Sequence, residues 1–130
     1  MKRFLPLLLL LPLLTATLPS IAQKKVVVKE FPNGKPEVII YVKVVDGVEV
    51  KVKEEAYYEN GNMEYSGEYN KEGAEHGTWK YWYENGKIKA EEKWTNGMEN
   101  GTFKEYHPDG KLAREIIYKN GKKLKTIEKK

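Results

Sequence analysis

Short turn signals recur along this chain at a nearly fixed spacing, and they constrain its fold more than any other feature. Eight of the eleven glycines follow Asn or Asp, and such pairs favour tight turns because they tolerate positive φ. The gaps between them are too short for a typical helix with its connections, so the pattern favours strands. The pairs that set the main period, 24 to 27 residues apart, are Asn33-Gly34, Asn60-Gly61, Asn85-Gly86 and Asp109-Gly110.

Residues around these turns agree at the same period. In the last three turns, the second position after the turn glycine is apolar and the eighth is aromatic. Several columns that agree at one spacing indicate an internal repeat, in which each unit buries its apolar face against its neighbours. One full unit runs from Gly77 to Gly101, and the first unit fits least well because Val42 replaces the aromatic residue. The matching residues are Met63, Ile88 and Leu112, then Tyr69, Trp94 and Tyr118, and also Trp79 with Phe103.

Apolar and polar residues alternate between the turns, which is the pattern of a β-strand. Residues 23–56 are rich in Val and Ile, and Asp46-Gly47 lies between two such runs, where it predicts a hairpin with positive φ at both turn residues. Such strands are hazardous at an exposed edge, so we expect partners on both sides or charged protection. The lysines that could give this protection are Lys43, Lys51 and Lys53. Further turns are expected at Asn96-Gly97, Asn100-Gly101 and Asn120-Gly121.

These patterns predict an all-β fold, an elongated antiparallel meander of tandem β-hairpin repeats of about 24 residues. Residues 23–56 are expected to form a divergent N-terminal β repeat or cap, and residues 57–130 the regular repeats with a basic C-terminal tail. The tail carries six lysines after Tyr118 against one glutamate. We expect a solvated, frayed terminus there, and weak attraction to an anionic membrane is the alternative.

The first 22 residues have the layout of a secretory signal peptide. Lys2 and Arg3 precede an apolar run, and small residues occupy the positions before a cleavage site at Ala22. An uncleaved membrane anchor is the alternative, but three prolines break the run and it is short for a span of about 20 residues. The sequence therefore predicts a secreted or periplasmic protein that begins at Gln23 after cleavage.

Composition excludes several classes of function. The chain has no cysteine, which excludes disulfides, thiolate metal sites and a lipid-anchored lipoprotein. Its net charge is +4, and two of these charges belong to Lys2 and Arg3. A nucleic-acid-binding domain usually shows a strong basic excess on one face, so we expect no nucleic-acid partner.

The turn and strand motifs resemble the MORN repeat in its bacterial variant form. The resemblance rests on residues 81–88, then Asn96-Gly97, then residues 101–106, with the same pattern at 57–61 and 107–112. It implies an elongated sheet of hairpins, no catalysis and no cofactor, and a role in binding proteins or membranes. Bacterial proteins with such repeats are often named as antitoxin components of toxin–antitoxin systems. The predicted signal peptide does not fit a cytoplasmic antitoxin.

Candidate catalytic residues are few. His76 and His107 both lie beside turn residues, and a metal site needs three or four converging ligands. Ser66 is the only serine after residue 22 and lacks a Gly-x-Ser-x-Gly setting. The carboxylate pairs are adjacent in sequence, so in a strand their side chains point to opposite faces, which does not suit a shared acid–base site. These pairs are Glu54-Glu55 and Glu91-Glu92. We therefore expect no enzyme.

Two binding functions remain open. The first is a non-catalytic extracytoplasmic scaffold that binds an unknown protein partner through the repeated sheet. The second is a module that binds cell-wall glycan or an anionic membrane through exposed aromatics and the lysine tail. Aromatic rings stack on sugars, but they also fill the core of a thin sheet, so the sequence leaves both uses open for the candidate binding residues Trp79, Tyr81, Trp82, Tyr83 and Trp94.

Overall fold

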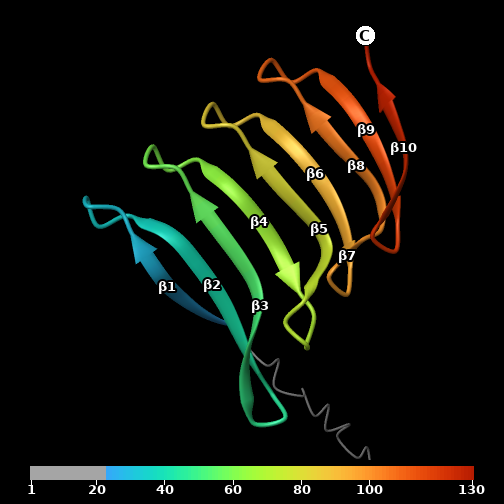
Figure 1. Cartoon of the computed structure of the whole chain (residues 1–130). Helices are drawn as coiled ribbons and strands as arrows, with labels where there is room; N and C mark the ends of the chain where they lie inside the picture. The colour runs from blue at the N-terminus through green and yellow to red at the C-terminus, as the bar shows by residue number, and fades with distance from the viewer. Residues whose placement is uncertain (1–22) are drawn as a thin grey trace, which may run out of the picture.

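A computed structural model describes residues 23–130, and these residues form one open antiparallel sheet (Figure 1). The predicted signal peptide lies outside the described residues. Consecutive strands are neighbours throughout, with the short β7 pairing only with β6. The strands are β1 Lys24–Glu30, β2 Pro36–Val45, β3 Val48–Tyr57, β4 Met63–Tyr69, β5 Glu75–Trp82, β6 Ile88–Thr95, β7 Met98–Glu99, β8 Gly101–Tyr106, β9 Leu112–Lys119 and β10 Lys122–Glu128.

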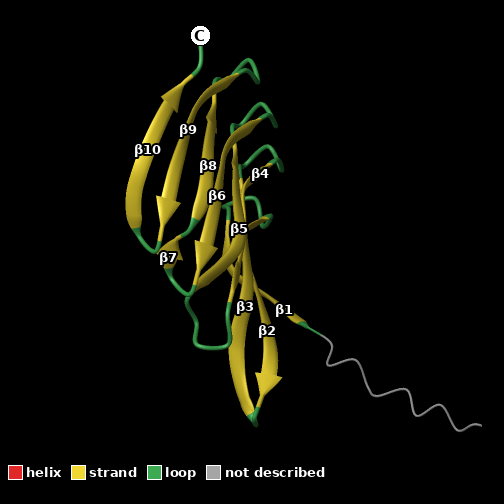
Figure 2. Cartoon of the chain, turned by 90° about the vertical axis from the view of Figure 1, so that its right-hand side faces the viewer, coloured by secondary structure: helices red, strands yellow, loops and turns green. Residues whose placement is uncertain are grey.

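The predicted all-β meander is therefore confirmed. Figure 2 shows the strands in one twisted layer, with no second layer of described residues against either face. Residues 23–130 contain no helix, and so none that could cross a membrane. The sheet buries few apolar side chains completely, because a single layer covers neither of its faces. The buried apolar residues are Ile39, Val42, Ala56, Trp79 and Phe103.

Asn-Gly and Asp-Gly pairs form two kinds of turn. Five-residue turns connect the strands at one end of the sheet, and in them only the glycine has positive φ. The Asn or Asp side chain of each such turn accepts a hydrogen bond from the backbone N–H two residues later, over 2.8–3.0 Å. This side chain replaces a missing backbone partner and fixes the turn. The five-residue turns of this end are 31–35, 58–62, 83–87 and 107–111.

The opposite end of the sheet has tight two-residue turns. Asp46 and Gly47 have φ of 50° and 79°, which confirms the predicted hairpin with positive φ at both positions. The turns at Asn96-Gly97 and Asn120-Gly121 have the same geometry. A five-residue turn without an Asn-Gly pair, residues 70–74, replaces the tight turn between β4 and β5.

The Asn100-Gly101 pair does not form the expected turn. It interrupts the strand between β7 and β8, where the Asn100 N–H donates to the carbonyl of Lys93. Gly101 has φ of 124°, and a Cβ there would lie 3.0 Å from Cβ of Lys93. The pair is therefore a break within one continuous pairing with β6, and glycine is required by the backbone and the close neighbour.

The edges of the sheet are β1 and β10. The Val-rich β2 and β3 are paired on both sides as expected, whereas β1 is an edge strand in which Val27 and Val28 are exposed. The expectation of a frayed lysine tail is wrong: Lys122–Glu128 pairs with β9, and Lys129 continues with a backbone hydrogen bond to Ala113. Leu124, Thr126 and Ile127 lie among the lysines of β10, and Thr and Ile favour strands. Each edge strand has a bulge, which leaves Val28 in β1 and Leu124 in β10 as extra residues.

Candidate functional site

One face of the sheet carries two clusters of large rings, and we call it the aromatic face. Its first cluster surrounds Trp79, whose ring lies 6.2 Å from that of Tyr65 and 5.2 Å from that of Tyr69. Its second cluster has Phe103 at the centre, 5.8 Å from Trp94 and 4.7 Å from Tyr118. Seven rings from five strands make up the aromatic face: Tyr65, Tyr69, Trp79, Tyr81, Trp94, Phe103 and Tyr118.

Trp79 fits the aromatic face because its neighbour on β4 is glycine. A Cβ at Gly67 would lie 2.0 Å from the Trp79 ring, so no larger residue can stand there without a shift. The indole N–H donates to the carbonyl of Glu68 over 3.1 Å. Trp79 is 6% exposed, and it therefore belongs to the core. The other rings of this face, apart from Phe103, are half-buried.

Carboxylates lie among these rings. Glu54 accepts hydrogen bonds from Tyr65 (2.6 Å) and Tyr69 (3.3 Å), and Lys51 pairs with it at 2.8 Å. Burial opposes ionisation of Glu54, but Lys51 and the two hydroxyls outweigh it and hold the pKa below its usual range. The resulting contact network is polar as well as aromatic.

Glu92 lies between the two ring clusters and behaves in the opposite way. Trp94 donates its indole N–H to this carboxylate over 3.0 Å. Burial raises the pKa of Glu92, and the nearby carboxylates Glu99 and Glu105 raise it further, while Trp94 and Tyr81 counter this only in part. Burial is therefore the main cause of the raised pKa, although Lys89 lines the same pocket as Glu92.

The other face of the sheet carries an alternating row of charges, which we call the charge row. Lys80 is opposite Glu91, Glu91 is opposite Lys104, and Lys104 is opposite Glu115 in successive strand pairs. Lys129 extends the row by pairing with Glu115 at 2.9 Å. Cross-strand pairs of opposite charge favour this register. The two faces therefore differ sharply in chemistry.

Adjacent carboxylates point to opposite faces, as the strand pattern predicts. Glu54 belongs to the aromatic face, whereas Glu55 is bound by Tyr41 and Tyr57, each at 2.8 Å, and by Lys53 at 2.6 Å. Glu55 is 6% exposed, and these three donors lower its pKa although burial opposes this. This arrangement does not bring two carboxylates to one reaction centre.

The five candidate binding residues have different places. Trp79 is core, while Tyr81 and Trp94 are half-buried on the aromatic face. Trp82 and Tyr83 act at the end of β5: the Trp82 carbonyl accepts from Tyr58 over 2.8 Å, and the Tyr83 hydroxyl donates to the carbonyl of Tyr106 over 2.7 Å. The candidate set did not include four members of the face, although the repeat columns contained the last three of them: Tyr65, Tyr69, Phe103 and Tyr118.

The two histidines do not come together. His76 begins β5 and its Nδ1 accepts a long hydrogen bond from Asn96, whereas His107 opens a turn at the other end of the sheet. Both are exposed. Across residues 23–130 the structure groups no three potential metal ligands.

Comparison with known proteins agrees with the repeat. The MORN repeat variant matches the chain three times in tandem, at residues 52–71, 75–96 and 99–120. No curated protein and no solved structure gives a significant match. MORN repeats are in general non-catalytic modules that bind proteins or membranes. The repeat period, the hairpin sheet and these three matches together show that the chain belongs to the MORN repeat variant family.

Proposed function

We propose that this protein is a non-catalytic binding module outside the cytoplasm, and that it holds a protein partner on the aromatic face. The observation that carries the proposal is a row of half-buried Tyr and Trp side chains with no described layer above them. Tyr and Trp supply large contact areas with few rotatable bonds, and they are enriched at protein interfaces. The predicted signal peptide supports the location.

The chemistry of the aromatic face indicates which side chains a complementary partner surface would carry. Tyr81 and Trp94 offer apolar contact, and burial raises the pKa of Glu92 between them. A partner that brings a basic side chain over Glu92 would restore its charge while burying the rings. We therefore expect a partner segment that combines apolar side chains with a lysine or arginine.

The test is capture of envelope proteins by immobilised residues 23–130, followed by affinity measurement with the purified partner. Trp94→Ala should weaken binding by about 10-fold or more, because buried rings dominate interface energies. Lys104→Ala on the charge row is the matched control and should change the affinity by less than about twofold. Circular dichroism and thermal unfolding check that both variants fold.

Two outcomes would contradict the proposal. If Lys104→Ala weakens binding and Trp94→Ala does not, the partner uses the charge row. If only wall polysaccharide is retained, and Trp94→Ala abolishes that retention while remaining folded, the aromatic face binds glycan and the protein-binding proposal is wrong.

A further inference from the structure

Neighbouring five-residue turns are tied together in the regular repeats. The Tyr58 hydroxyl donates to the carbonyl of Trp82, and one repeat later the Tyr83 hydroxyl donates to that of Tyr106. The turn asparagines add a second tie. Asn60 donates through Nδ2 to the carbonyl of Glu84 over 3.0 Å, and Asn85 donates to that of Pro108 over 3.1 Å.

The first turn, residues 31–35, makes neither of these ties to the second turn, residues 58–62. Phe31 occupies the place of Tyr58 and Tyr83, and it has no hydroxyl group. Asn33 keeps the hydrogen bond within its own turn, to the N–H of Lys35, but within residues 23–130 its side chain makes none to the next turn. The boundary between the N-terminal hairpin and the first regular repeat is therefore less closed than the later ones.

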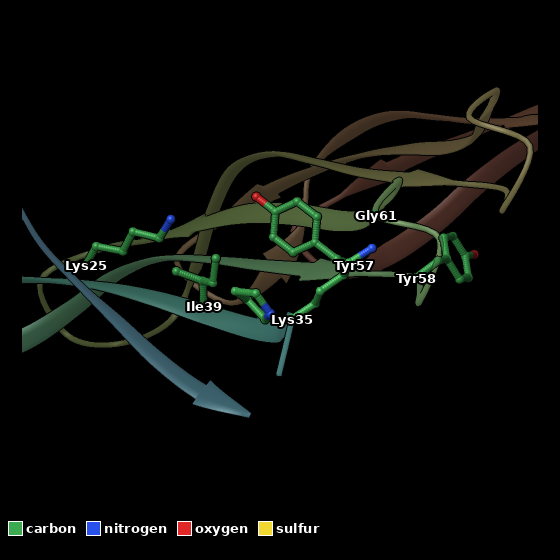
Figure 3. Close-up of a pocket in the computed structure, with 7 residues that line it drawn as sticks. Lys25, Lys35, Ile39, Tyr57, Tyr58 and Gly61 are labelled. Atoms are coloured by element: carbon green, nitrogen blue, oxygen red, sulfur yellow. The ribbon is translucent and has the colours of Figure 1, made fainter. Parts of the chain in front are cut away.

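A pocket of about 250 Å³ lies at this boundary. Its floor is apolar, formed by Ile39, Pro36 and the ring of Tyr57, and the second turn closes it at Tyr58. Lys25 from β1 and Lys35 from the first turn reach it from either side of Ile39 in Figure 3. Both lysines are exposed, whereas Ile39 is 2% exposed.

The two lysines are not neutralised by the described part of the chain. Their neighbours Lys24 and Lys29 pair with Glu49 and Glu37, but no ion pair within residues 23–130 involves Lys25 or Lys35. The nearby carboxylate of Glu55 is already held by Lys53 and two tyrosine hydroxyls. The Tyr57 hydroxyl is one of these donors, so only its ring is free to meet a ligand.

We propose that this pocket binds a small organic carboxylate with an aromatic or aliphatic body. The carboxylate lies between Lys25 and Lys35, and the body rests on Ile39 and the Tyr57 ring. The volume is below the 300–1,000 Å³ typical of drug-sized ligands, so the ligand has about the size of one aromatic carboxylate. The apolar floor of the pocket favours a ligand with an apolar body, which inorganic phosphate lacks.

The site is independent of the aromatic face, because its residues come from β1 to β3 and the two turns that flank them. A variant of Trp94 should leave carboxylate binding unchanged, and variants of the two lysines should leave the protein partner bound. Failure of one proposal is therefore distinguishable from failure of the other.

Titration of the purified protein with phenylacetate, followed by amide chemical shifts in NMR, tests the site. We expect saturable shifts at Lys35, Ile39 and Gly61, and much weaker ones with the neutral phenylacetamide. Lys25→Ala and Lys35→Ala should each weaken phenylacetate binding about threefold to fivefold, since an exposed ammonium contributes modestly. The double variant should lose about 10-fold to 25-fold, because the effects of separate side chains add in free energy.

Lys111→Ala is the matched control, because Lys111 follows the turn glycine in the last repeat as Lys35 does in the first. It should leave the affinity unchanged. Equal binding of phenylacetamide, equal binding of inorganic phosphate, or full affinity in the folded double lysine variant would each overturn the proposal. The amide spectrum of each variant without ligand shows whether it has folded.

Discussion

The N-terminal hairpins and the regular repeats are parts of one sheet, yet they are stabilised differently. Aliphatic side chains fill the N-terminal part, where Ile39, Val42 and Ala56 are buried. Rings fill the repeats, where Trp79 and Phe103 are buried in equivalent places. The β2–β3 hairpin also extends beyond the other turns of its end (Figure 1). A repeat sheet can therefore change its packing along its length while its pairing continues unbroken.

The turns show the same contrast. The regular repeats connect each five-residue turn to the next through a tyrosine hydroxyl and an asparagine amide, and the first turn has neither connection. Regularity supplies stability to the repeats, and the departure from it leaves space for a pocket. Where a repeat protein breaks its own pattern is thus informative about where a ligand can enter.

The largest test of this comparison removes the central ring of the repeats. Trp79→Ala should lower the free energy of unfolding by about 3–5 kcal/mol, because a buried indole is lost and its cavity remains. Ile39→Val, in the N-terminal part, should cost only about 0.5–1.5 kcal/mol. Urea unfolding measures both. Comparable losses in the two variants would show that the rings do not dominate the stability of the repeats.

Gly67→Ala tests the same contact from β4, where the glycine makes room for the Trp79 ring. The added methyl group would overlap the Trp79 ring, and we expect a loss of about 1–3 kcal/mol from overpacking. Ser66→Ala on the opposite face should cost less than about 0.5 kcal/mol. In a Trp79→Ala background the Gly67→Ala change should become nearly neutral, and additive losses in this double-mutant cycle would contradict direct contact.

Two carboxylates should give the two regions opposite pH dependence. The pKa of Glu55 is lowered on folding, so its contribution is present above its ordinary value of 4.5 and is lost as pH falls through the folded pKa. The pKa of Glu92 is raised on folding, so its contribution to stability is present below pH 4.5 and is lost as the pH rises through the folded pKa.

Unfolding at pH 7 and at about pH 3.5 tests this contrast. Glu55→Gln should lower the stability by about 1–3 kcal/mol at pH 7, because charge-assisted hydrogen bonds are lost, and by less in acid. Glu92→Gln should change the free energy of unfolding more favourably at pH 7 than at about pH 3.5. Parallel pH profiles for the two variants would be inconsistent with these environments.

The smallest expected effect concerns the ties between turns. Tyr83→Phe removes one hydroxyl and should cost about 0.5–1.5 kcal/mol, the net value of a hydrogen bond. Phe31→Tyr places a hydroxyl where the first turn lacks one, and it should gain up to a similar amount by reaching the Tyr57 carbonyl. A lower unfolding temperature in Phe31→Tyr would contradict the inference that the first boundary is less closed because it lacks the hydroxyl group that ties the later turns together.

Much of the fold could be predicted from local sequence alone. Asp46-Gly47 determined a tight turn because few other conformations suit that pair between two β-branched runs. Asn100-Gly101 could not be distinguished in this way, since its role as a break depends on the pairing of β6 with both β7 and β8. β10 was missed because its lysines resemble a solvated tail, and within residues 23–130 it pairs with β9 alone.

The surfaces were harder to predict than the strands. The sequence identified Trp79, Tyr81 and Trp94 as notable, but exposure separated the core ring from the half-buried ones. The pocket was not predicted, because Lys25 and Ile39 come together with Tyr57 only through the registers of two strand pairs. Absence of a hydroxyl at Phe31 was visible in the sequence, but its meaning depended on the contacts that Tyr58 and Tyr83 make.

Bulges mark both outer strands, and they have a consequence for how such a protein can vary over evolutionary time. Each interior unit contacts only its two neighbours, while the bulged, lysine-bearing β1 and β10 discourage growth at either end. Duplication or loss of one whole unit between them would lengthen or shorten the molecule without redesigning its ends. The length of such a molecule can therefore change in steps of one repeat.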